Sequence, residues 1–166
     1  MCDNDPDQRI VKLLSSDGNI LEISRKGSRQ SATLNDLIVA SGFDDKKGMV
    51  DPIQVNNITA EVLTKVICFC EHYKNDEILD GEASSERDIT SYDVQFMNVD
   101  KFMVHKLILA AVHLKIESLL DVSTTTFAGM LKGKTTEEMR IFLEIENDFT
   151  PEEEEELRME REALDD

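Results

Sequence analysis

Short apolar runs separated by turn residues open the chain, a pattern typical of a small β-sheet. The runs at 10–14 and 20–23 flank Asp17-Gly18, and an Asp-Gly pair supplies the positive φ angles of a tight hairpin turn. A brief alternation of apolar and polar residues follows at 51–55 and contains a proline. Because proline cannot donate a ladder hydrogen bond, this segment suits the beginning of an edge strand.

Apolar residues at helical spacing predict two helices around that last strand. The segment 31–40 is the first, and Gly42 stands where a left-handed cap would end it. Thr59 is placed to cap the second. The buried face of this second helix is predicted to consist of Val62, Val66, Phe69 and Tyr73. The following segment, 75–91, is too polar to offset its ordering entropy by burying apolar area, so we expect a mobile acidic loop there.

The second half of the chain is predicted to be helical throughout. Asp100 can cap a central helix. One face of that helix carries Met103, Leu107, Ala110 and Leu114, and its apolar surface is widened by Phe102, Ile108, Ala111 and Val112. The next helix covers 117–132 and ends at Gly133.

Two capping boxes mark the starts of the last two helices. Thr135 and Glu138 form the first, since each side chain can bond the backbone of the other. Thr150 and Glu153 form the second, with Pro151 at its favoured first position. Both helix starts are therefore defined by local sequence.

The last helix leaves two interpretations open. Residues 151–166 include nine acidic and two basic side chains, and the apolar positions are Leu157, Met159, Ala163 and Leu164. So thin a stripe anchors a helix poorly on its own protein. The segment is either a frayed solubilising tail or a helix that closes over a partner. A stripe on the preceding helix is likewise either core or interface; it consists of Leu120, Thr124, Phe127 and Leu131.

Composition limits the classes of partner. A chain of 166 residues with 40% hydrophobic residues supports one core with an appendage. Its 35 acidic and 18 basic residues give a net charge of -17, which would repel nucleic acid and an anionic membrane face. Apolar runs stay well below the roughly 20 residues of a membrane span, and the N-terminus lacks a signal-peptide pattern. We expect an intracellular protein that binds neither nucleic acid nor membranes.

Candidate catalytic and metal sites are weak. Cys68 and Cys70 lie two residues apart on a helix and so point about 200° away from each other, which prevents them from joining His72 around one metal ion. The N-terminal aspartates imitate a calcium loop but lack its glycine and bidentate glutamate; they are Asp3, Asp5 and Asp7. His72 and His105 are expected on solvated helix faces, and no histidine has a nucleophile at motif spacing. We predict no catalytic residue, no metal and no cofactor.

Several segments closely resemble, in order, the Skp-type (S-phase kinase-associated) adaptors of SCF cullin-RING ubiquitin ligases. In the second half they are KLILAA at 106–111, LLDV at 119–122, MLKGKTTEE at 130–138 and NDFTPEEEEE at 147–156. In the first half they are KLLSSDG at 12–18 and VICFC at 66–70. Nearly the whole chain is similar to this family without large gaps.

The resemblance implies a fold and a function. The fold is a BTB/POZ domain of the α/β (α+β) class over 9–131, with a small sheet and helices, followed by a helical extension over 132–166. The function is that of a non-enzymatic adaptor, cytoplasmic and nuclear, which links an F-box substrate receptor to a cullin scaffold. The F-box-binding residues implied by similarity are Leu120, Thr124, Phe127, Leu131, Leu143, Ile145, Asn147, Phe149 and Leu157.

The chain departs from the family pattern at two places, and the first of them, Val112-His113, motivates an alternative function. Val112-His113 stands where the family commonly has an Asn-Tyr pair that faces the cullin, so these two residues are the implied cullin-binding positions. Residues 161–163 read Arg-Glu-Ala where the family tail usually has an Asn-Gln-Trp clasp. The alternative is a divergent paralogue that binds an F-box protein, or self-associates as a homodimer through the POZ surface, without recruiting a cullin.

Overall fold

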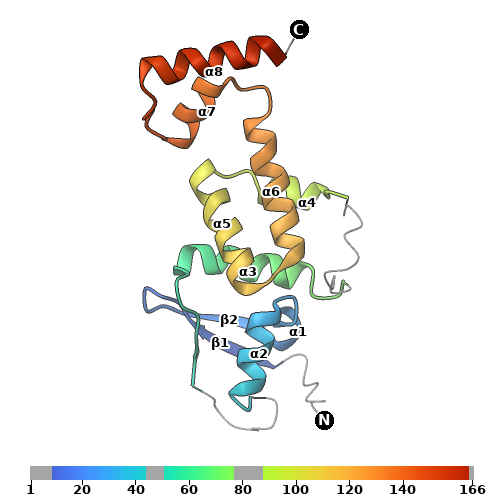
Figure 1. Cartoon of the computed structure of the whole chain (residues 1–166). Helices are drawn as coiled ribbons and strands as arrows, with labels where there is room; N and C mark the ends of the chain where they lie inside the picture. Colours follow the sequence, from blue (N-terminus) through green and yellow to red (C-terminus); the bar gives the residue numbers. More distant parts are fainter. Residues whose placement is uncertain (1–8, 44–50, 77–87, 165–166) are drawn as a thin grey trace, which may run out of the picture. The chain divides into compact units, whose positions relative to one another are not determined.

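The computed structural model describes residues 9–43, 51–76 and 88–164, and the chain divides into two compact units, Met1–Met130 and Leu131–Asp166. In the first unit the strands are β1 (Ile10–Leu14), β2 (Ile20–Ser24) and β3 (Ile53–Gln54). Its helices are α1 (Arg25–Ser28), α2 (Ala32–Ala40), α3 (Ala60–His72), α4 (Ser91–Phe96), α5 (Lys101–Leu114) and α6 (Glu117–Leu131), the last of which runs one residue into the second unit. The second unit contains α7 (Thr136–Leu143) and α8 (Pro151–Leu164) (Figure 1). Within the described residues this mixed composition confirms the predicted α/β class.

The sheet has the order β2-β1-β3, with β1 antiparallel to β2 and parallel to β3. The edge position predicted for the third strand is confirmed, and the Val55 amide extends the pairing by donating to the Leu14 carbonyl at 2.8 Å. The hairpin turn differs from the prediction. Gly18 has a positive φ of 83°, but Asp17 does not. The Asp17 carboxylate instead accepts a hydrogen bond from the Ala60 amide at 2.9 Å, which joins the turn to the start of α3.

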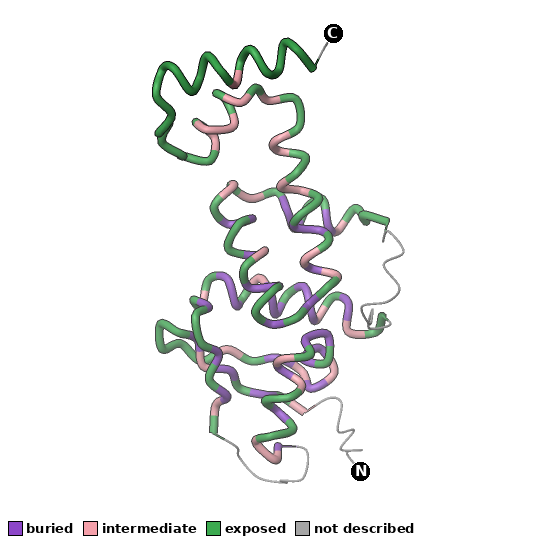
Figure 2. Tube along the Cα trace, in the orientation of Figure 1, coloured by how far each residue is buried: buried purple, intermediate pink, exposed green. Residues whose placement is uncertain are grey.

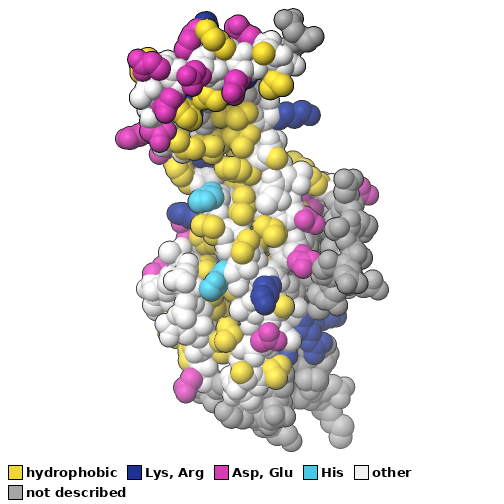
Figure 3. Space-filling model, in the orientation of Figure 1, with side chains coloured by type: hydrophobic (Ala, Val, Ile, Leu, Met, Phe, Trp, Pro, Cys, Tyr) yellow, Lys and Arg dark blue, Asp and Glu magenta, His cyan; other side chains and the backbone are white. Residues whose placement is uncertain are grey.

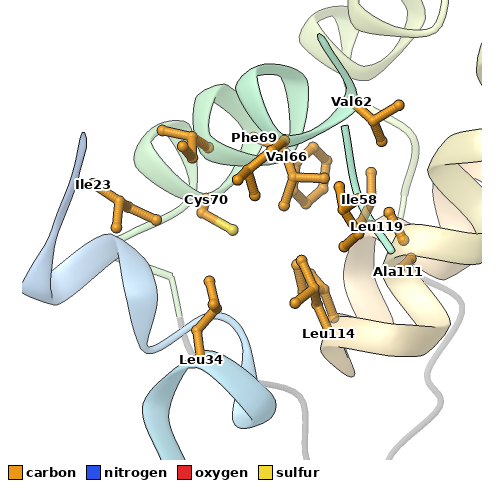
Figure 4. Close-up of a cluster of buried hydrophobic side chains, with 14 of the residues drawn as sticks. Ile23, Leu34, Ile58, Val62, Val66, Phe69, Cys70, Ala111, Leu114 and Leu119 are labelled. Carbon is orange, nitrogen blue, oxygen red and sulfur yellow. The ribbon is translucent and has the colours of Figure 1, made fainter. Parts of the chain in front are cut away.

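The core of the first unit is built around α3. The four residues predicted for its buried face are all buried. Figure 4 shows side chains from β2, α2, α3, α5 and α6 converging on this cluster, among them Ile23, Leu34, Phe69, Leu114 and Leu119. Thr59 is the cap residue of α3 as predicted, but its side chain makes no capping hydrogen bond. Asp17 supplies that acceptor from the hairpin, so the helix start depends on tertiary contact.

Two short helices were not predicted. Ser24 caps α1 by accepting from the Gly27 amide at 2.9 Å. A capping box of Thr90 and Asp93 starts α4 inside the segment predicted as a mobile loop; residues 77–87 of that segment lie outside the described residues. The Asp93 carboxylate also accepts from the Tyr73 hydroxyl at 2.8 Å. Both helices are too short to show an apolar period, and cap and tertiary contacts define them.

The long helices agree closely with the sequence. Asp100 caps α5 by accepting from the amides of Phe102 and Met103. The predicted inner face is buried throughout, and α6 ends one residue before the predicted limit, ahead of Gly133 with its φ of 79°. Measured against the length and hydropathy that a bilayer crossing demands, every described helix falls short.

The second unit is a pair of helices without a core. Both predicted capping boxes are present, since Thr135 and Thr150 exchange hydrogen bonds with Glu138 and Glu153 respectively. No residue of α7 or α8 is buried, and Figure 2 shows these two helices in the colours of intermediate and exposed residues. Their structure is therefore held by local bonds and a few contacts between them.

Candidate protein-binding surfaces

The last turns of α6 carry the first group of implied F-box-binding residues. Buried positions in this helix end at Ser123. Leu120 and Phe127 are half-buried, and Thr124 is exposed with its hydroxyl donating to the Leu120 carbonyl at 2.7 Å. Because the Thr124 hydroxyl is satisfied by its own helix, an apolar partner can cover it at little cost. The stripe of Leu120, Thr124, Phe127 and Leu131 is therefore neither fully buried nor fully exposed, and a partner could cover the apolar area that remains exposed.

The second unit carries the remaining group, which is largely exposed. Leu143, Ile145, Asn147 and Phe149 are exposed, whereas Leu131 and Leu157 are half-buried. Ile141 on α7 is 76% exposed and was missed by the sequence analysis, because the resemblance marked no role for it. Apolar side chains this open contribute little to the stability of the unit itself. They form an apolar surface that lacks a covering element within the described part of the second unit.

Arg140 joins the two helices of the second unit. Its guanidinium lies 3.7 Å from the Glu154 carboxylate and 5.4 Å from the centre of the Phe149 ring. Asn147 donates to the same carboxylate through Nδ2, and its Oδ1 accepts from the Phe149 amide at 3.3 Å. Arg161 adds a bond of 3.2 Å to the Thr136 hydroxyl. Asn147, predicted to bind the partner directly, therefore also orders the connection that presents Phe149.

The electrostatics of α8 favour its helical state. Its first turn carries Glu152, Glu153 and Glu154, whose negative charge complements the positive end of the helix dipole. Further along, Arg158 and Glu155 form an exposed ion pair, which is worth little by itself. The acidic face of α8 would favour a partner with basic residues around its apolar contact.

The implied cullin-binding residues lie on the outer side of α5. Val112 and His113 are both exposed, and Val112 is 58% exposed. Beside His113 the structure contains a pocket of about 410 Å³. Its lining comes from the residues that lead into α3, from the first turn of α3 and from α5. It consists of Asn57, Ile58, Thr59, Val62, Lys106, Leu109, Ala110 and His113. The sequence analysis missed Leu109, although an α5 apolar on more than one side was a signal that an outer face exists.

The candidate metal ligands do not converge. Cys68 is exposed and Cys70 is buried, as the helical spacing predicted. Burial raises the pKa of the Cys70 thiol to about 12, so it stays protonated and is a poor ligand. His72 is exposed and stacks on Tyr92, with ring centres 3.5 Å apart. Within the described residues no set of three metal-ligating side chains comes together, and the three N-terminal aspartates lie outside those residues.

Comparison with known protein families finds one match in the first half of the chain and another in the second half. Residues 9–75 match the Skp1 family tetramerisation domain, and residues 117–164 match the Skp1 family dimerisation domain. The first segment covers β1 to α3, and the second covers α6 to α8. The two matches follow the order in which the family-like segments occur in the sequence.

Curated relatives are similar along nearly the full length. A Skp1-related protein of Caenorhabditis elegans is 44% identical, over 92% of this chain and 90% of its own. The SCF ubiquitin ligase complex protein SKP1a of Dictyostelium discoideum is 40% identical, over 95% and 96%. The E3 ubiquitin ligase complex SCF subunit sconC of Arthroderma benhamiae is 41% identical, over 92% and 93%. Since identity at this level extends over both family segments, the chain belongs to the Skp1 family.

Proposed function

We propose that this protein is a non-enzymatic adaptor that links an F-box substrate receptor to a cullin scaffold in an SCF-type ubiquitin ligase. The observation that carries the proposal is the similarity, over more than nine-tenths of the chain, to relatives named as SCF complex subunits. An adaptor contributes no chemistry of its own. It acts by holding a bound substrate near the transfer machinery, which raises the effective concentration of one for the other.

We assign F-box binding to the nine residues that the resemblance implies. Most are exposed or half-buried apolar side chains, and they belong to α6, α7, α8 and the segment between α7 and α8. Covering one such side chain contributes about 1.5 to 3 kcal/mol. Four or five of them would outweigh the cost of association and leave a stable pair. This supports the interpretation of α8 as a partner-binding helix over that of a solubilising tail. The capping box keeps the start of α8 helical, and its exposed apolar side chains are then available to a partner.

One substitution tests the site. Phe127→Asp places a charge in the stripe of α6 that an F-box partner would cover. Because burying a charge against apolar side chains is costly, the variant should abolish binding of an F-box fragment. Phe127 lies beyond the last buried position of α6, Ser123. The core around α3 should therefore stay folded, and the circular dichroism spectrum of the variant should match that of the wild type. Unchanged affinity in the folded variant would remove Phe127 from the site.

A second candidate function follows from Val112-His113. Without the amide and phenol that the family commonly presents there, the protein would bind an F-box receptor but recruit no cullin, and would act as a structural or regulatory paralogue. Self-association through the POZ surface belongs to the same candidate, and it is supported by the match of residues 9–75 to a domain that the family description calls a tetramerisation domain. Sedimentation velocity over a range of concentrations would detect such a homodimer.

Titration calorimetry separates the two functions. The protein is co-expressed with an F-box fragment, and the complex is titrated with a cullin N-terminal domain. Submicromolar binding supports the adaptor. An F-box complex that gives no heat with the cullin at two temperatures overturns the adaptor and favours the paralogue. For localisation we propose the cytoplasm and nucleus, which imaging of a fluorescent fusion would test.

A further inference from the structure

The outer side of α5 is unusual for so acidic a chain. Between Lys101 and Leu114 there is no Asp or Glu, although the protein has a net charge of -17. The exposed positions of this helix define what we call the α5 outer face: Phe102, His105, Lys106, Leu109, Val112 and His113. Figure 3 shows hydrophobic and histidine side chains together over this region of the first unit.

Exposed apolar area on this face is substantial. Phe102, Leu109 and Val112 are each more than half exposed, at 52%, 57% and 58%. They occur at i, i+7 and i+10, so they share one side of the helix with Lys106 and His113. Apolar side chains gathered in one patch, with polar groups around them, are typical of a protein-binding surface. The helix is 14 residues long, which gives the face a length of roughly 20 Å.

The pocket gives this face a place for an anchor. Its buried lining is apolar and consists of Ile58, Val62 and Ala110. Its exposed lining residues are the polar Lys106, His113 and Asn57 together with Thr59 and the apolar Leu109. No carboxylate lines it. An apolar side chain of a partner can therefore enter the pocket while a carboxylate next to it on the partner reaches Lys106.

We propose that the α5 outer face selects a scaffold helix that carries an apolar anchor flanked by acidic side chains. The inference rests on the proposed adaptor function and names the chemistry of the partner at that surface. Charge complementarity favours this occupant. The net charge of -17 opposes an acidic partner overall, whereas α5 has no Asp or Glu and presents Lys106 to acidic side chains at this face. Val112-His113 then changes which scaffold is accepted, because an apolar and a basic side chain replace two polar neutral ones.

The test uses the full chain in complex with an F-box fragment, titrated with purified N-terminal domains of several cullin paralogues. Lys106→Glu should weaken the tightest pairing at least tenfold, because it sets like charges against each other. Lys12→Glu, an identical charge change on the outer surface of the sheet, is the matched control and should change the affinity less than twofold. Raising the salt concentration from about 50 to about 300 mM should weaken the binding of the wild-type complex to the cullin. It should also reduce the difference in affinity between wild type and Lys106→Glu.

The outcomes separate this inference from the adaptor function. A wild-type complex that binds a cullin with an affinity unchanged by Lys106→Glu overturns the acidic-helix inference alone. A wild-type complex that binds no cullin overturns the adaptor, and the inference with it. A second copy of the chain is the competing occupant: a wild-type dimer that Lys106→Glu dissociates would also overturn the inference.

Discussion

The two units of this protein are stabilised in different ways. The first has a continuous core in which Phe69, Leu63 and Leu107 are fully buried. The second has no buried residue in either of its helices. Burial of apolar area is the largest favourable contribution to folding. The first unit thus draws its stability from a buried core. The second depends on its capping boxes, on the contacts of Arg140 and on a partner that covers its apolar side chains.

The difference indicates where each apolar residue acts. An apolar side chain in the first unit mostly stabilises the fold, so its removal is measured as a loss of stability. An apolar side chain in the second unit mostly stabilises a complex, so its removal is measured as a loss of affinity. Single substitutions can test this division, because the two readouts are independent.

The largest effect is expected from Phe69→Ala. Phe69 is fully buried and packs against Tyr73 and Phe96, with ring centres 4.8 and 5.5 Å away. The cavity should lower the free energy of unfolding by about 3 to 5 kcal/mol, measured by urea denaturation. Phe102→Ala is the matched control at a site 52% exposed, and should cost less than about 0.5 kcal/mol. Equal losses in the two variants would contradict a core centred on α3.

The next effect concerns affinity. Ile145→Ala should weaken binding of an F-box fragment roughly tenfold or more, since the lost apolar contact is worth about 1.5 kcal/mol. The urea midpoint of the free protein should not move. Ile20→Ala is the matched control: Ile20 is 56% exposed on the sheet, and Ile145 is 57% exposed. If both variants bind as tightly as wild type, Ile145 is not part of the site.

Sequence reasoning was most successful where a pattern is long or a signature is local. The inner face of α5 was predicted residue by residue, because a 14-residue helix repeats its apolar period several times. The capping box of Thr135 and Glu138 was predicted because it needs only four adjacent residues. For the same reason the edge strand at Ile53 was recognised from one proline and a brief alternation.

Features that depend on distant residues were not predicted. The start of α3 is capped by Asp17, 43 residues away, so Thr59 alone could not reveal it. The helix α4 follows a polar segment, and its Asp93 is held by Tyr73 from α3. The pocket beside His113 requires α3 and α5 to be placed together, which no local pattern encodes. The nine F-box-binding positions came from family resemblance, and they stay a prediction.

A smaller, pH-dependent effect is expected at Glu71. Burial alone would raise the pKa of this carboxyl, but hydrogen bonds from Ser24 and the nearby Lys74 outweigh it, and the pKa lies below its ordinary value of 4.5. The Ser24 amide donates at 2.6 Å. Glu71→Gln keeps an acceptor but loses the charge, so it should cost about 1 to 1.5 kcal/mol at pH 7.

The sign of the pH dependence follows from the lowered pKa. A carboxyl with a folded-state pKa below its unfolded value stabilises the protein fully above the unfolded value, and this contribution is lost as the pH falls through the folded one. The stability difference between wild type and Glu71→Gln should therefore be constant near neutrality and shrink below about pH 4.5. Urea denaturation at pH 7, 5 and 3.5 measures it. A difference that grows on acidification would contradict the assignment.

The smallest effect is expected from removing a helix cap, and the same change can be made in a capping box of each unit. Thr135→Ala removes the acceptor of the Glu138 amide and should cost α7 about 0.5 to 1 kcal/mol. Since the second unit has no core, this loss should appear as faster hydrogen exchange in α7, with the urea midpoint unchanged. Thr90→Ala removes the equivalent cap of α4, but the Thr90 hydroxyl also lies 2.9 Å from that of the buried Tyr73. This variant should therefore lower the urea midpoint. If Thr135→Ala lowered the midpoint equally, the second unit would unfold together with the first, and its stability would have to come from more than local bonds.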